Sequence, residues 1–213
     1  HRKNKNIILK DGRELLEFIS CSYLGLDQHE KIKQAATENI DRYGFAFHCA
    51  RTRGQIDIAN QLDFLLSKIF CGMSPVTFAT LHVAHLGMFP LLGSGALPSY
   101  PLQANGAYFI LDKYAHASMQ INRALMEQFG PVVIADFSNT DILEERFNEA
   151  KKKNMTPIAI CDGVGSMGGV LPLMSLLRLA EKYHGYLYID DANGTSVHGK
   201  YGCGYVLSKL PVN

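Results

Sequence analysis

The sequence predicts an α/β protein in which a mostly parallel sheet is flanked by helices in three layers. Two observations support this prediction: apolar runs of strand length recur in the second half of the chain, and stretches of helical length separate them. Strands buried on both faces read as continuous apolar runs, and alternation with helices implies parallel crossovers. The expected strands are 107–111, 132–135, 157–161 and 186–189, and the expected helices are 115–128, 141–153 and 173–184.

The N-terminal part of the chain has a different pattern. Asp11-Gly12 lies between two short apolar runs, which is a β-hairpin signal. Residues 30–43 predict a helix that ends at Gly44. Apolar residues recur at helical spacing from Ile58 to Phe70, so we expect that segment to pack one face inward. We expect an N-terminal segment with a hairpin over residues 1–30 and one larger domain over residues 31–213.

Composition excludes several classes of protein. With 47% apolar and 19% charged residues among 213, the chain has ample apolar surface to bury and is not disordered. A formal net charge of +1 gives no reason to expect nucleic acid or an anionic membrane as a partner. No apolar run approaches the roughly 20 residues that span a bilayer, and we expect no signal peptide, because the chain does not open on a basic and then apolar stretch. Five widely spaced cysteines without a C-x-x-C pair indicate reduced thiols, so we expect a cytoplasmic protein.

An acidic residue follows each expected strand. Because ligands of open α/β sheets bind outside the carboxyl ends of the strands, a functional site is expected there. The acids at these positions are Asp112, Asp136, Asp162 and Asp190.

Two local patterns favour structural interpretations. The segment from Gly163 to Gly168 matches the dinucleotide pattern G-x-G-x-x-G, but the next helix is expected to begin only near Pro172, too late to serve a pyrophosphate, which favours a glycine-rich turn. His82 and His85 stand three apart, on one face of a helix. Since the sequence places no third ligand, we expect core or surface histidines and no metal site.

A third interpretation treats the strand ends together. Asp190, His116 and Ser166 could converge on one aromatic cofactor. A buried aspartate can keep a pyridinium nitrogen protonated, which makes a pyridoxal ring an electron sink. An imidazole can stack on such a ring, and a hydroxyl can bond its phenolic oxygen. For Asp190 and its neighbour Asp191, a helix cap or turn is the alternative.

Four segments resemble motifs of the α-oxoamine synthases, a family of pyridoxal-phosphate (PLP) enzymes. The segments follow one another in the same order as the family motifs. Residues 21–26 (C-S-Y-L-G-L) resemble N-D-Y-L-G-L, and residues 112–118 (D-K-Y-A-H-A-S) resemble D-x-x-x-H-A-S. Residues 162–168 (D-G-V-G-S-M-G) resemble E-G-V-F-S-M-D-G, and residues 190–204, which open D-D-A-N-G-T, resemble D-D-A-H-G-T-G-x-x-G-x-x-G-x-G. The resemblance implies the large domain of a fold-type I PLP-dependent transferase (the aminotransferase class I/II fold), without the small C-terminal domain. Such proteins are normally homodimers with sites at the subunit interface.

The resemblance also implies roles for individual residues. Asp190 would pair with the pyridine nitrogen, His116 would stack on the ring, and Ser166 would bond near the phenolic oxygen. The cofactor-binding set it implies is Thr80, Leu81, His82, His116, Asp162, Ser166, Asp190 and Asn193, with Thr80, Leu81 and His82 at the phosphate turn. The catalytic set it implies is His116, Asp190 and Asn193.

The reaction that the resemblance implies is condensation of an amino acid with an acyl-coenzyme A thioester to an α-aminoketone. The chain departs from the family motifs at Cys21, Leu81, Asn193 and the bulky segment 44–51. Neither Lys200 nor Lys209 has the context of the family's Schiff-base lysine. We therefore expect a fragment of a longer enzyme, inactive alone, with a degenerate homologue as the alternative. Two further functions stay open: a non-catalytic partner subunit of the same fold and a PLP-dependent aminotransferase.

Overall fold

The chain divides into two compact units, residues 1–62 and residues 63–213, and each is described by itself. The structure is a computed structural model that describes residues 2–3, 5–46, 49–167 and 169–211. Of the motif positions discussed above, Gly168 and two residues of the segment 44–51 lie outside the described residues. The division of the sequence after residue 30 stays a prediction.

The first unit contains a small antiparallel sheet and one long helix. Strands β1 (Arg2–Lys3), β2 (Asn6–Ile8) and β3 (Glu14–Leu16) pair in sequence order, and Gly12 takes a positive φ of 87° in the turn between β2 and β3. The predicted hairpin is therefore confirmed. Helix α1 (Glu30–Tyr43) ends as predicted at Gly44, where φ is 80° and the backbone N–H donates to Ile40 O.

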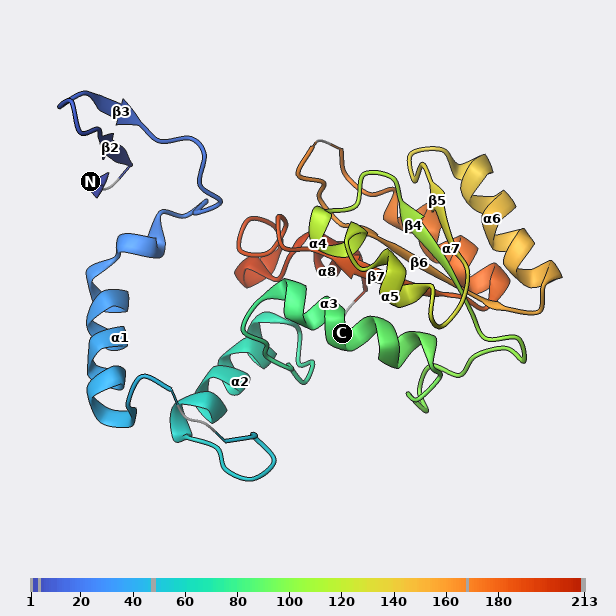
Figure 1. The fold of residues 1–213 in the computed structure, drawn as a ribbon, viewed down its shortest axis with the longest axis horizontal. Helices are drawn as coiled ribbons and strands as arrows, with labels where there is room; N and C mark the ends of the chain where they lie inside the picture. Colours follow the sequence, from blue (N-terminus) through green and yellow to red (C-terminus); the bar gives the residue numbers. More distant parts are fainter. Residues whose placement is uncertain (1, 4, 47–48, 168, 212–213) are drawn as a thin grey trace. The chain divides into compact units, whose positions relative to one another are not determined.

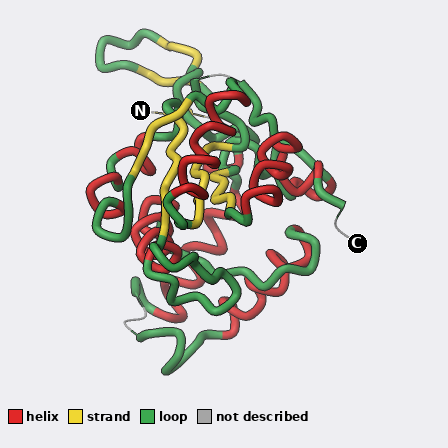
Figure 2. Tube along the Cα trace, turned by 90° about the vertical axis from the view of Figure 1, so that its right-hand side faces the viewer, coloured by secondary structure: helices red, strands yellow, loops and turns green. Residues whose placement is uncertain are grey.

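The second unit is built around a four-stranded parallel sheet (Figure 1). Its strands stand in the order β5-β4-β6-β7 and match the four predicted runs: β4 (Ala107–Asp112), β5 (Val132–Ala135), β6 (Thr156–Asp162) and β7 (Tyr186–Asp190). The helices of this unit are α3 (Leu81–Gly93), α4 (Ala117–Gln120), α5 (Arg123–Met126), α6 (Thr140–Lys152), α7 (Leu173–Tyr183) and α8 (Tyr205–Lys209). Figure 2 shows these strands in yellow running side by side among the red helices.

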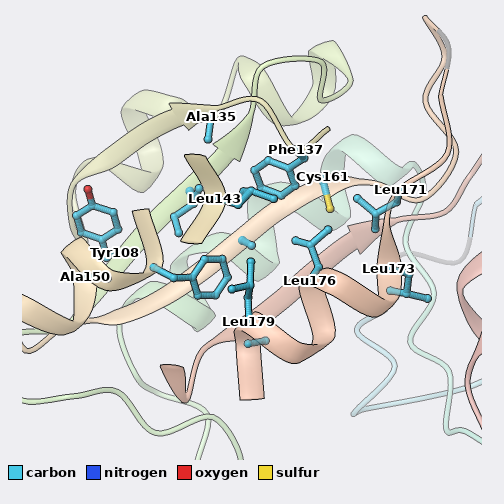
Figure 3. Packing of buried hydrophobic residues seen from close by; sticks show 14 residues of the cluster. Tyr108, Ala135, Phe137, Leu143, Ala150, Cys161, Leu171, Leu173, Leu176 and Leu179 are labelled. Carbon is cyan, nitrogen blue, oxygen red and sulfur yellow. The ribbon is translucent and has the colours of Figure 1, made fainter. Parts of the chain in front are cut away.

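Helices cover both faces of this sheet, because successive side chains of a strand point to opposite faces. Tyr108 of β4 packs in one cluster with Leu143 of α6 and Leu176 of α7 (Figure 3). Ile110 of β4 belongs to the same cluster. Phe109 and Leu111, which alternate with these β4 residues, pack with residues of α3, α4 and α5. The three-layer α/β architecture predicted from the sequence is therefore confirmed.

The predicted helix over residues 115–128 is two short helices, α4 and α5. The break comes at Asn122, whose side-chain Nδ2 donates to the carbonyl oxygen of Ser118 at 2.7 Å. Asparagine side chains offer the backbone such an alternative to helical hydrogen bonding. Helix α7 begins at Leu173, directly after Pro172, in agreement with the prediction.

Helix α2 (Asp57–Ile69) lies where it was predicted, but its apolar side chains are more exposed than predicted. None of its residues is buried, and Ile58, Leu62 and Leu65 are 40%, 46% and 55% exposed. Leu66 and Ile69, at the same apolar spacing, are half-buried. The expectation that one face of this helix packs inward is therefore met only in part.

Candidate active site

The acids at the strand ends fall into two groups. Asp162 and Asp190 are register partners at the ends of β6 and β7. They follow Ile160 and Tyr188 by two residues, and those residues pack on the α3 side of the sheet. Asp112 follows Ile110, which packs on the opposite side, and its Oδ1 accepts the backbone N–H of Phe137 at 3.3 Å. The alternation of the strands thus brings Asp162 and Asp190 together and directs Asp112 to the other face.

Asp190 is buried, and both of its carboxylate oxygens face a nitrogen. Oδ1 accepts the backbone N–H of Ala192 at 3.0 Å. Oδ2 lies 3.4 Å from Nε2 of His85. The backbone oxygen of Asp190 accepts the N–H of Gly163 at 2.7 Å, which joins the loop after β6 to the end of β7. The carboxylate is therefore held in a fixed position at the carboxyl edge of the sheet.

His85 of α3 is a site residue that the sequence reasoning missed. Its ring is fully buried, stacks on Phe89 with centroids 5.5 Å apart and an interplanar angle of 3°, and places Nδ1 2.8 Å from the hydroxyl of Tyr188. His82, expected on the same face, is exposed in the first turn of the helix. The buried stripe of α3 begins at His85 and continues through Phe89 and Leu92, so the two histidines have different environments.

His116 stands at the start of α4 and contacts Asp162 through its backbone. Its N–H donates to Asp162 Oδ2 at 2.8 Å, while its exposed imidazole pairs Nδ1 with the hydroxyl of Ser118 at 2.8 Å. Burial raises the pKa of Asp162 to about 6, the hydrogen bond from His116 lowers it, and the charge of Asp190 raises it further. Asp162 thus lies electrostatically close to both His116 and Asp190.

The N-terminus of α3 carries the candidate phosphate turn. Thr80 caps the helix, and its Oγ1 accepts the N–H of Val83 at 3.2 Å. The first N–H groups of a helix have no partner within the helix, which makes such an end suited to anions. Leu81 and His82 are both exposed there, Leu81 by 43%. One helix therefore presents this N-terminus and, within its first turns, His85 beside Asp190.

Ser166 and Asn193 lie in the loops that follow β6 and β7. Asn193 donates from Nδ2 to the carbonyl oxygen of Val164 at 3.0 Å and so links the two loops. Ser166 is exposed in a turn that is closed by a bridge between Val164 and Val170. This geometry agrees with the predicted glycine-rich turn, because its glycines do not open α7.

A pocket of about 300 Å³ lies at the same edge of the sheet. Its polar lining comes from Asp112, Tyr114, Ser138 and Asp162, and its apolar lining includes Phe137 and Leu171. Asp162 therefore borders this pocket and also lies in register with Asp190.

Two other features, a metal cluster and a membrane-spanning helix, are absent from the described residues. Across residues 2–3, 5–46, 49–167 and 169–211, no group of three or more His, Cys, Asp or Glu side chains could hold a metal ion. Over the same ranges, no helix is long and apolar enough to cross a membrane. The pair of strand-end acids therefore remains the main candidate for a functional site.

Comparison with known proteins identifies relatives over nearly the whole chain, although no family model matches it. The 8-amino-7-oxononanoate synthase of Thermoanaerobacter pseudethanolicus is 32% identical over 200 residues, which are 91% of this chain and 47% of that protein. The serine palmitoyltransferase of Sphingobacterium spiritivorum is 28% identical over 206 residues, 95% of this chain and 48% of that protein.

Solved structures show the same fold. A Sphingomonas wittichii serine palmitoyltransferase superposes with a TM-score of 0.81 at 21% identity, covering 96% of this chain and 48% of that one. The 8-amino-7-oxononanoate synthase of Francisella tularensis gives a TM-score of 0.68 at 21% identity, covering 90% and 49%. This chain spans about half the length of the relatives it matches. Over that half, the chain is a homologue of the α-oxoamine synthase family, as its four motifs indicate.

Proposed function

We propose that this chain forms the PLP-binding part of an acyltransferase of the α-oxoamine synthase type. The observation that carries the proposal is the buried carboxylate of Asp190, fixed at the carboxyl end of β7 beside Asp162. The relatives named above support it, because a serine palmitoyltransferase is an acyltransferase by name. A further solved serine palmitoyltransferase with the same fold contains PLP (TM-score 0.77, 21% identity, covering 96% of this chain and 49% of that one).

The residues present fit PLP in three respects. A pyridine nitrogen needs a fixed acid, and Asp190 is buried with its Oδ1 held by the N–H of Ala192. A ring face needs a flat group, and the exposed imidazole of His116 lies at the neighbouring strand end. A phosphate needs N–H donors, and the N-terminus of the 13-residue helix α3 offers them beside the hydroxyl of Thr80. Leu81, at the position of a family glycine, narrows the approach to those donors.

Each residue of the set has a proposed task. PLP bound here would supply an electron sink for a carbanion at the substrate α-carbon. Asp190 would hold a proton on the pyridine nitrogen, and His116 would cover one face of the ring. Ser166 would bond near the phenolic oxygen, while Thr80 and the N–H groups of Leu81 and His82 would hold the phosphate. Asp162 positions His116 through its backbone N–H. Asn193 would donate a hydrogen bond at the substrate side.

The proposed reaction breaks one bond of the thioester and forms one carbon–carbon bond. The carbon–sulfur bond of the thioester breaks, and a bond forms between the acyl carbon and the α-carbon of the amino acid. The α-carbon loses its proton and its carboxyl group, which leaves as carbon dioxide, and regains one proton from solvent. The products are the α-aminoketone, carbon dioxide and coenzyme A, whose sulfur takes up the proton that left the α-carbon.

The proposal includes a cytoplasmic homodimer. Five free thiols, two of them buried, support a reducing compartment. The exposed apolar side chains of α2 support a second copy as the partner, since apolar patches of this kind commonly mark protein interfaces. Amino acid and acyl-coenzyme A are the proposed substrates.

The test has two parts, because we expect the 213-residue chain to be inactive alone: PLP binding is measured on this chain, and release of free coenzyme A thiol from an acyl-coenzyme A is measured on the longer enzyme of which it is expected to be a fragment, supplied with PLP and single amino acids. We expect PLP to bind the chain, with a change in its visible absorbance, and thiol release by the longer enzyme to require an amino acid. Asp190→Asn should lower thiol release about 10²–10³-fold, because an amide cannot hold the pyridinium proton. Asp136→Asn, which changes an acid at another strand end, should leave thiol release unchanged. Folded protein that neither binds PLP nor releases thiol would refute the proposal.

A second candidate is a non-catalytic subunit of the same fold. Two observations favour it: Leu81 projects a side chain at the phosphate turn, and the amide of Asn193 is already bonded to Val164 O. Folded protein that binds no PLP would support this candidate. PLP binding with amino transfer to a keto acid, and without thiol release, would support an aminotransferase.

A further inference from the structure

A buried polar chain of three side chains runs from β7 through α3 and back to β7. The hydroxyl of Tyr188 lies 2.8 Å from Nδ1 of His85, and Nε2 of the same ring lies 3.4 Å from Oδ2 of Asp190. The His85 ring is fully buried, and Asp190 is buried as well. Nothing in the proposed function uses His85 or Tyr188.

The fold brings these three side chains together by two periodicities. Tyr188 and Asp190 are two residues apart on one strand and therefore share the face covered by α3. His85 begins the buried stripe of α3, and Phe89 one turn later stacks parallel to its ring at 5.5 Å. Tyr188 also meets the rings of His85 and Phe89 edge-on, at 5.6 and 5.1 Å. These contacts fix the plane of the imidazole, so that its two nitrogens face Tyr188 and Asp190.

The positions of the protons follow from both neighbours of the ring. Burial raises the pKa of Tyr188 to about 12, so its hydroxyl keeps its proton and can either donate to Nδ1 or accept from it. Asp190 Oδ2 beside Nε2 is a carboxylate oxygen, which accepts, and this favours a neutral imidazole with its proton on Nε2 and with Nδ1 accepting the Tyr188 O–H. Nε2 is buried and has no hydrogen-bond partner among the described residues, and Asp190 Oδ2 lies 3.4 Å from it, at ion-pair distance.

We infer that His85 is a positioning residue for Asp190: Tyr188 holds the imidazole as its Nε2–H tautomer, and that N–H holds the Asp190 carboxylate in place. The need for such a donor comes from Asp162, the register partner of Asp190 on the next strand, because two carboxyl groups side by side repel each other. An N–H aimed at Asp190 fixes the position from which its carboxylate could hold a pyridinium proton. The link to PLP rests on the proposed function, whereas the tautomer assigned to His85 does not depend on PLP.

The tautomer is measured first, on protein without PLP. Two-bond ¹H–¹⁵N correlation spectra of ¹⁵N-histidine-labelled protein distinguish the two neutral tautomers and the imidazolium. The His85 signals are assigned by their loss in His85→Gln. We expect the Nε2–H tautomer in the wild type, a mixture of tautomers in Tyr188→Phe, and no change in Tyr186→Phe. Tyr186 is a matched control because it lies on the same strand and face, and its hydroxyl donates to Pro101 O. A protonated Nδ1 on His85, in either the other tautomer or the imidazolium, would overturn the inference.

The second measurement is PLP affinity. His85→Leu keeps apolar bulk but removes the donor, so the PLP dissociation constant should rise about 10- to 100-fold. His85→Gln retains an N–H at similar reach and should restore most of that loss. Tyr188→Phe should weaken binding less than His85→Leu, and Tyr186→Phe should not weaken it. Equal affinity in wild type and His85→Leu would contradict the inference.

The two measurements separate this inference from the proposed function. If the wild type binds no PLP, the proposed function fails, while the tautomer spectra still decide the role of His85. If PLP binds and the spectra show a protonated Nδ1 on His85, only the inference fails. Should His85→Leu not fold, Tyr188→Phe and its Tyr186→Phe control decide the case, since each removes a single oxygen atom.

Discussion

Asp162 and Asp136 are aspartates at the ends of two strands of one sheet, and their surroundings shift their pKa values in opposite directions. Burial raises the pKa of Asp162 to about 6, because little around it compensates its charge apart from the N–H of His116. Asp136 is 2.7 Å from Lys113 Nζ and accepts hydrogen bonds from Ser138, and these lower its pKa to about 2. Position at a strand end therefore does not determine the charge of an acid; its neighbours do.

This difference predicts a pH dependence of stability. A raised pKa means that Asp162 stabilises the fold at pH below about 3.8, and that this contribution is lost as the pH rises through about 6. Asp162→Asn keeps an acceptor for the His116 N–H and removes the titration. We expect the wild type to lose about 1–3 kcal/mol of unfolding free energy relative to this variant between pH 4 and pH 7. Urea unfolding at the two pH values measures the difference.

Asp136→Asn is the matched control. The contribution of Asp136 is present above pH 3.8 and is lost only as the pH falls towards 2. The pH dependence between 4 and 7 should therefore be the same in this variant as in the wild type, apart from a narrow effect near pH 4. If the unfolding free energies of the wild type and Asp162→Asn changed with pH in the same way, Asp162 would not be the group responsible for the pH dependence.

At the residue scale, the sequence predicted part of the candidate site. The runs ending at Asp162 and Asp190 place both acids at one sheet edge, because parallel strands end together. The role of His85 was not predictable in this way. Its position in an apolar segment signals burial, but which strand face α3 covers depends on packing far along the sequence. Alternation on β7 could have placed Tyr188 and Asp190 on one face, without naming their partner.

At the scale of the elements, the loop after β7 is organised around one carboxylate. Asp191 Oδ2 accepts the N–H of Val206 at 2.9 Å, while Oδ1 is buried without a hydrogen bond. A Cβ at Gly163, Gly194 or Gly204 would come within 2.2–2.6 Å of its oxygens. These glycines, one after β6 and two after β7, therefore make room for Asp191, which ties the start of α8 to the end of β7.

Alanine substitutions test this account of the loop. Gly204 has a φ of 103°, and its Cβ would lie 2.4 Å from Asp191 Oδ2, so Gly204→Ala should cost about 2–4 kcal/mol. Gly87 lies inside α3 with Phe78 at an ordinary contact of 3.7 Å, so Gly87→Ala should stabilise by about 0.5–1 kcal/mol. Urea unfolding of both variants provides the comparison. An unchanged free energy of unfolding in Gly204→Ala would show that Asp191 can move aside freely.

Most element boundaries were predictable because local patterns and the fold agree. The four strands are short apolar runs rich in β-branched and aromatic residues, and β4 and β6 are buried on both faces, so each run is visible without knowledge of its partners. The break between α4 and α5 was not predictable, because Asn122 turns its amide to Ser118 O only in the folded chain. The burial of α2 was predicted only in part, since apolar spacing indicates a face to be covered but not how fully it is covered: Leu66 and Ile69 are half-buried, whereas Leu65 is exposed.

At the scale of the whole molecule, apolar surface is distributed unevenly. The sheet of the second unit buries two apolar clusters, one on each face. Helix α2 leaves Ile58, Leu62 and Leu65 between 40% and 55% exposed on one side of the helix. Uncovered apolar stripes of this kind favour association with other chains. Self-association of the 213-residue chain is therefore the expected behaviour in solution.

A charge placed on that stripe should weaken the association. Leu65 lies on the apolar side of α2 and is already half exposed, so Leu65→Glu should leave the fold intact and reduce self-association. Asn60→Glu adds the same charge on the opposite, polar side of the helix and should not change association. Size-exclusion chromatography with light scattering should give a mass well above 23.6 kDa for the wild type and Asn60→Glu, and a lower one for Leu65→Glu. A monomeric wild type at about 50 µM, or equal masses for the two variants, would show that this stripe does not recruit a second copy.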